Sequence, residues 1–116
     1  MRAHLINVNE RAITEVVLAE DDYREISRAI GCDLFTVADN FNIKERRGDS
    51  LYVDDEGLLK PGLPLFMFTA PGKPAQYLAG NGLVLGIDFS IGESCDVSIP
   101  LSELETYISW TDLVTS

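Results

Sequence analysis

Apolar and polar residues alternate in two short segments near the start of the chain, residues 3–8 and 12–18, which are separated by the polar stretch Asn9-Glu10-Arg11. Alternation with β-branched residues is typical of strands that bury one face. Glu15 falls on the same face as Ile13 and Val17, so that face of the second segment is partly solvated. The pattern predicts an N-terminal β-hairpin.

The apolar spacing changes to that of a helix over residues 21–30. One stripe of this helix holds Tyr23, Ile26 and Ile30. Asp22, with Glu25 three residues later, matches a capping box, and Gly31 is placed to end the helix in a left-handed conformation. We expect this helix to pack against the hairpin.

The middle of the chain predicts two strands, residues 34–37 and 50–53, joined by a solvated loop. The only cluster of three bases lies in that loop, at Lys44, Arg46 and Arg47, and is too small for a nucleic-acid site in a strongly acidic chain. The acids of Asp54-Asp55-Glu56-Gly57 do not continue into a calcium-binding frame, so we interpret them as a turn in which Gly57 has a positive φ.

Seven of the nine glycines and four of the five prolines fall in residues 57–92, which predicts short strands connected by many turns. Its most apolar part holds Phe66, Met67 and Phe68, which we assign to the core, with an exposed contact patch as the alternative. The composition of residues 70–75 indicates a mobile loop. Gly80-Asn81-Gly82 precedes a strand rather than a helix, so we interpret it as a hairpin turn rather than as a phosphate-binding loop.

The last part of the chain predicts a short strand at residues 95–99 and a terminal helix. Ser102 and Glu105 match a capping box, and Trp110 would follow at the helix end as a lid on the core. The helical stripe comprises Leu101, Leu104 and Ile108. Together the segments predict an α+β fold: a mixed, mostly antiparallel sheet of about five strands with two helices packed on one face, in a single compact domain spanning residues 1–116.

Charge is the most unusual global property of the chain. Nineteen acidic residues against nine basic ones give a net charge of −10, and no lysine or arginine follows Lys73. We expect an acidic face formed by Glu93, Asp96, Glu103 and Glu105. Such a field disfavours nucleic acids and anionic membranes and favours basic protein surfaces, although acidity that serves only solubility is an equal alternative.

The sequence offers little for catalysis. It lacks a Ser/His/Asp or Cys/His set, and its single histidine, His4, with Cys32 and Cys95 set far apart, provides too few ligands for zinc. We therefore expect no enzyme, no metal and no cofactor. Because no apolar run is long enough to span a bilayer and the start of the chain has no apolar signal-peptide core, we expect a cytoplasmic protein. In that setting we expect Cys32 and Cys95 to be unpaired, with Cys32 as a small buried thiol.

The order of three motifs resembles a domain of unknown function common in bacteriophages, plasmids and actinobacterial mobile elements. These motifs are Ala29-Ile30-Gly31-Cys32, the core Leu51-Tyr52-Val53-Asp54-Asp55-Glu56-Gly57-Leu58-Leu59-Lys60, and the strand Gly80-Asn81-Gly82-Leu83-Val84-Leu85-Gly86. The resemblance spans nearly the whole chain and implies a small accessory protein of a mobile element, with no catalytic residues to carry over.

The leading hypothesis is a non-enzymatic accessory protein that presents its acidic surface to a basic protein or nucleoprotein complex of the host, for example to inhibit a defence complex. The alternative is a small-molecule or nucleotide-binding module that uses the glycine-rich C-terminal half. The sequence does not indicate the oligomeric state.

Overall fold

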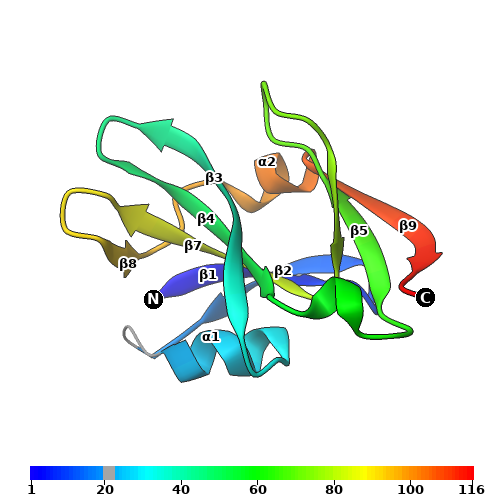
Figure 1. Cartoon of the computed structure of the whole chain (residues 1–116). Helices are drawn as coiled ribbons and strands as arrows, with labels where there is room; N and C mark the ends of the chain where they lie inside the picture. Colours follow the sequence, from blue (N-terminus) through cyan, green and yellow to red (C-terminus); the bar gives the residue numbers. More distant parts are fainter. Residues whose placement is uncertain (20–22) are drawn as a thin grey trace.

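The structure is a computed structural model that describes residues 1–19 and 23–116. It consists mainly of β-strands in two antiparallel sheets, with two short helices (Figure 1). The predicted α+β fold, with one sheet of about five strands, is therefore wrong. Most of the segment that the sequence assigned to a loop (39–49) lies in strands, as do Ile108 and Trp110, which it assigned to the end of a helix.

The larger sheet has six strands. Five follow the spatial order β2-β1-β7-β4-β3, and β8 also pairs with β7. Their bounds are β1 Arg2–Asn7, β2 Ala12–Val17, β3 Phe35–Lys44, β4 Arg47–Asp54, β7 Gly82–Asp88 and β8 Glu93–Cys95. The central strand β7 places Val84 opposite His4 of β1 and Leu51 of β4. β2 and β3 lie at the two ends of this five-strand order, and the short strand β8 is paired with β7 alone among the strands described.

The smaller sheet has three strands in the order β6-β5-β9. Their bounds are β5 Pro64–Phe68, β6 Gln76–Ala79 and β9 Ile108–Val114. The remaining elements are the helices α1 (Tyr23–Ile30) and α2 (Leu101–Glu105) and the 3-10 turn η1 (Gly57–Leu59).

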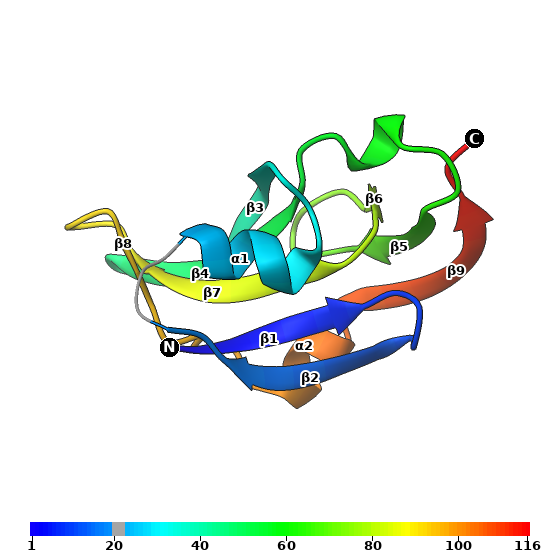
Figure 2. The same ribbon diagram turned by 90° about the horizontal axis from the view of Figure 1, so that it is seen from below.

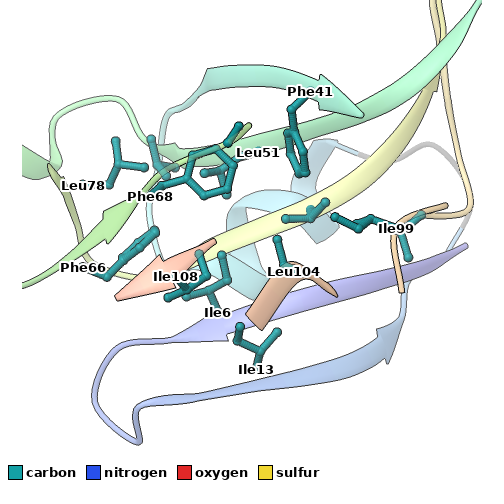
Figure 3. Close-up of a cluster of buried hydrophobic side chains, with 14 of the residues drawn as sticks. Ile6, Ile13, Phe41, Leu51, Phe66, Phe68, Leu78, Ile99, Leu104 and Ile108 are labelled. Atoms are coloured by element: carbon teal, nitrogen blue, oxygen red, sulfur yellow. The ribbon is translucent and has the colours of Figure 1, made fainter. Parts of the chain in front are cut away.

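Two apolar clusters form on opposite faces of the larger sheet, because successive side chains of a strand point to opposite sides. Val84 belongs to the cluster that also holds Phe66 of the smaller sheet and Leu104 of α2 (Figure 3), whereas Leu83 packs with Ile26 of α1. The helices thus lie on opposite sides of the sheet, as Figures 1 and 2 show. The prediction that both pack on one face is wrong.

The N-terminal predictions are mostly confirmed. β1 and β2 form the expected hairpin, and α1 ends at Gly31, which has a φ of +85° and donates to the Ser27 carbonyl at 2.8 Å. The predicted cap Asp22 lies outside the described residues. Tyr23 was wrongly assigned to the buried stripe: it is 63% exposed, and its ring contacts the Arg24 guanidinium.

The predicted solvated loop at residues 39–49 is instead the continuation of the β3–β4 hairpin. Irregularities in the register between Val37 and Asp39, and between Phe41 and Lys44, interrupt the alternation that would have marked a strand. Phe41 from this segment is only 2% exposed and packs edge-on against Phe68.

Four predictions in the C-terminal half are wrong. The strand predicted at 95–99 ends at Cys95, and Ser102 lies inside α2 rather than capping it, since the N-cap is Pro100. Ile108 and Trp110 belong to β9 rather than to the helix and its end. Gly80-Asn81-Gly82 is a turn, but it joins β6 of one sheet to β7 of the other and so forms no hairpin.

Gly57 also departs from its prediction, because its φ is not positive. A glycine is needed there for close packing: a Cβ at this position would lie 2.9 Å from the Ala79 carbonyl oxygen.

Candidate functional site

The four acidic residues predicted to form one face lie on three separate parts of the chain. Glu93 is on β8, in a hairpin that projects away from α2 (Figure 1), while Glu103 and Glu105 are on α2. Asp96 lies between these elements. The four residues therefore do not gather into a single patch.

Asp96 is held by the first residues of β1. Its Oδ1 accepts the backbone N–H of Arg2 at 2.9 Å, and its Oδ2 lies 3.5 Å from the Arg2 guanidinium. The backbone hydrogen bond, followed by the side-chain contact, lowers the pKa of Asp96 below its ordinary value. Arg2 also pairs with Glu15 of β2, at 3.5 Å, so it is shared between two carboxylates.

Helix α2 lies over the face of β2 that carries Ile13 and Glu15. Leu104 and Ile13 belong to the same buried cluster, in which Figure 3 labels both. A cavity of about 460 Å³ between β2, α2 and β9 is lined by Arg11, Ile13 and Glu105, together with Ala12, Ile108 and Trp110. The helix thus places the Glu105 carboxylate beside β2.

Carboxylates outnumber guanidinium groups around this strand. Arg11, just before β2, donates to Asp112 at 2.5 Å, and Arg2 is shared as described above. We call this surface the β2–α2 face; it comprises the outer strand β2 with Glu10, Glu15, Asp96, Glu105 and Asp112, and the two arginines Arg2 and Arg11. Five carboxylates against two arginines leave it net negative.

Sequence reasoning missed the residue that anchors α2, because Asp49 was assigned to a solvated loop. Asp49, on β4, is 0% exposed, and its carboxylate accepts four hydrogen bonds. Oδ1 accepts the Ser98 N–H at 2.9 Å, and Oδ2 accepts the Ile99 N–H at 3.0 Å, the Asn42 amide at 2.8 Å and the Ser98 hydroxyl at 3.1 Å. These bonds fix the segment that leads into α2.

His4 holds the same segment from the other side. Its Nε2 lies 2.8 Å from the Ile99 carbonyl, which can only accept, so Nε2 carries the proton and donates it. The ring is 4% exposed, and its buried Nδ1 has no hydrogen-bond partner within the described residues. A histidine between alternating apolar residues gave no sequence signal for this role.

The alternative apolar contact residues lie mainly in the interior. Phe66 and Phe68 are 0% and 1% exposed, and Met67 between them is half-buried. Phe68 packs edge-on against Phe41 and near Tyr107, so it links the two sheets. These aromatic rings present no exposed patch.

The glycines of the C-terminal half allow close packing of strands. A Cβ on Gly82 would lie 3.0 Å from Leu51, and one on Gly86 would lie 2.2 Å from the Asp96 carbonyl oxygen, where the chain crosses β7. No helix follows these glycines directly; they lie in or next to β7. The arrangement offers no cradle of helix N–H groups for a phosphate.

The remaining chemical groups are few. Burial raises the pKa of both free thiols, Cys32 and Cys95, which keeps them protonated at neutral pH. Within residues 1–19 and 23–116, no three His, Cys, Asp or Glu side chains converge in a way that would hold a metal ion. None of the helices described has the length and apolar character needed to cross a membrane.

Comparison with known proteins gives one match. The family model of a domain of unknown function, DUF3846, matches residues 1–109. The chain belongs to this family. Membership in the DUF3846 family confirms the resemblance to a domain of unknown function that the three sequence motifs indicated. No curated protein and no solved structure shows significant similarity to the chain.

Proposed function

We propose that this protein is a non-enzymatic binding module that presents the β2–α2 face to a basic protein partner. The observation that carries the proposal is that four carboxylates, Glu15, Asp96, Glu105 and Asp112, lie beside two arginines at an outer strand, with Glu10 next to one of these arginines in the sequence. Opposite charge steers association and contributes to specificity at such a surface. The face includes two residues of the predicted acidic set, Asp96 and Glu105. Its three other carboxylates belong to Glu10, Glu15 and Asp112.

Glu93 and Glu103 fall outside the proposed face. Glu93 is on the projecting hairpin, and Glu103 accepts a hydrogen bond from the Tyr107 hydroxyl at 3.3 Å, toward Phe41. The motif resemblance suggests a phage or mobile-element setting, in which the partner would be a host complex that handles nucleic acid and so carries basic surface. Inhibition of such a complex is the most concrete form of this proposal.

The test uses a lysine-rich peptide as the probe and measures its Kd by titration at several salt concentrations. In one variant, four carboxylates of the face are neutralised: Glu10→Gln, Glu15→Gln, Glu105→Gln and Asp112→Asn. A matched control removes four exposed charges elsewhere: Asp33→Asn, Glu45→Gln, Asp55→Asn and Glu56→Gln. We expect the first set to weaken binding roughly tenfold and the control to weaken it much less, with affinity falling as salt rises.

Equal weakening by the two sets would show that net charge alone attracts the peptide, and the proposed face would be rejected. Melting temperatures of both variants verify that they remain folded, which we expect because exposed charges contribute little to stability.

A further inference from the structure

The outer edge of β2 has free backbone hydrogen-bonding groups at alternate residues. Met1 and Leu18 form a hydrogen-bonded pair, in which each backbone N–H donates to the carbonyl of the other residue. From this pair onward, the β1–β2 ladder alternates between non-hydrogen-bonded and hydrogen-bonded pairs. Val16, Thr14 and Ala12 direct their peptide groups toward β1. The N–H and C=O groups of Ile13, Glu15 and Val17 therefore point away from the sheet.

The far side of β1 verifies this alternation independently. Arg2, paired with Val17, directs its peptide groups away from β2: its N–H donates to Asp96 and its carbonyl accepts the Val97 N–H at 2.9 Å. On β2 the corresponding outward groups contact no other element within the described part of the chain. Figure 2 shows β2 as the outermost strand on its side of the sheet.

Three other outer strands, β3, β9 and β6, have contacts at their outer edges. On β3, Lys73 donates to the Asn40 carbonyl and to Asp39, and the register irregularities disrupt the strand further. On β9, Arg11 donates to the Thr111 carbonyl at 3.1 Å. Beside β6, Gly57 of η1 lies close against the Ala79 carbonyl. Proteins protect edge strands with bulges and covering segments; within residues 1–19 and 23–116, the β1–β2 ladder has no bulge and the outward peptide groups of β2 have no backbone hydrogen-bond partner.

We propose that the basic partner binds as an added β-strand along β2, an inference that rests on the proposed function and names its binding mode. Side chains of the added strand would alternate between the two faces of the sheet. On one face they would meet Glu15 and Glu105, which favours lysine or arginine. On the other they would lie beside Thr14 and Val16, which favours apolar residues.

Charge argues against a second copy of this chain as the added strand. A two-fold pairing of β2 with itself would bring the Glu15 side chains of both copies onto one face, and each chain carries a net charge of −10. The partner strand is therefore basic on one face and apolar on the other.

The experiment compares two peptide probes of the same composition, one with lysine and valine in alternation and one with its lysines and valines in separate blocks. We expect the alternating peptide to bind about tenfold more tightly, because only it can form the ladder with charges on one face. On binding, the amide hydrogens of Ile13, Glu15 and Val17 should become protected from exchange, while those of Thr14 and Val16 stay unchanged.

A proline at an outward position tests the ladder directly. Val17→Pro removes a backbone N–H that has no hydrogen-bond partner within the described residues, at a position whose side chain is 78% exposed. It should lower the affinity for the alternating peptide about tenfold and leave that for the block peptide unchanged, whereas Val17→Ala should change neither. If Val17→Pro lowers the melting temperature strongly, Glu15→Pro with Glu15→Gln as its control replaces it.

Two results would overturn the inference while leaving the proposed function in place. One is equal binding of both peptides without protection of the three alternate amides, which would indicate attraction by charge alone. The other is a dimer in sedimentation experiments without peptide that Val17→Pro dissociates, which would assign the edge to a second copy. Failure of both peptides to bind at low salt would reject the proposed function together with the inference.

Discussion

The strands at the two ends of the five-strand order, β2 and β3, differ in how their outer edges are protected. β3 is interrupted by register irregularities, and Lys73 donates to both Asp39 and the Asn40 carbonyl. β2 is regular over all six of its pairs with β1 and has an open outer edge. An open, regular edge favours association with other strands. The proposed addition of a strand at β2 needs this difference, because an added strand can pair with a regular edge but not with the obstructed edge of β3.

The acidic surroundings of β2 limit which strands it would accept. Carboxylates from β2 and α2, with Asp96 and Asp112, repel acidic segments, including other copies of this chain. On β3, the protection is built from backbone geometry and one lysine. Protection by charge is selective, because a basic strand overcomes it, whereas a blocked backbone excludes every strand.

The largest expected effect comes from removing the anchor of α2, the helix that packs beside β2. Asp49→Ala removes the acceptor for two buried backbone N–H groups, so we expect a loss of about 3–5 kcal/mol in the free energy of unfolding, measured with urea. Ser98→Ala should cost only about 1 kcal/mol, since the backbone bonds remain. Similar costs for the two variants would contradict the anchoring role of Asp49.

A smaller effect is expected from a substitution that would leave the edge of β3 as open as that of β2. Lys73→Ala uncovers the middle of β3, and we expect it to change stability by about 1 kcal/mol while causing self-association that increases with protein concentration in sedimentation velocity. Lys44→Ala removes the same charge from the end of β3 and should cause no self-association. If Lys73→Ala does not associate, the irregular register alone protects this edge.

The smallest effect concerns pH. The folded state lowers the pKa of Asp96, so its ionised form stabilises the fold above the ordinary aspartate pKa of about 3.9, and this contribution is lost as the pH falls through the folded value. Asp96→Asn should therefore flatten the acid limb of stability against pH, as measured by thermal unfolding between pH 2 and pH 7. Glu93→Gln is the matched control, and an equally flat limb there would refute the assignment to Asp96.

Local structure was predictable wherever neighbouring residues determine it. Alternation identified the β1–β2 hairpin, and Gly31 identified the end of α1. Both features depend on residues close in sequence. The acidic character of the surface was likewise readable from composition, although the grouping of Glu105 with Glu15 depends on the tertiary fold.

The errors arose where distant contacts determine the structure. Leu101, Leu104 and Ile108 match a helical stripe, but Ile108 pairs with Phe68 in β9, and that pairing outweighs local propensity. Asp49 looked like a loop residue because buried carboxylates are rare, and its donors come from residues about fifty positions later. The open edge of β2 was also invisible in the sequence, since it depends on which strands lie beside it.

The pairing of β1 with β7 has a consequence for how the chain folds during synthesis. His4 can pair opposite Val84 only after most of the chain has been made, and until then β1 and β2 can form only a two-stranded hairpin, which is marginally stable by itself. Folding dominated by such distant pairings is slow. We therefore expect the larger sheet to be completed late in folding, once β7 is available to pair with β1.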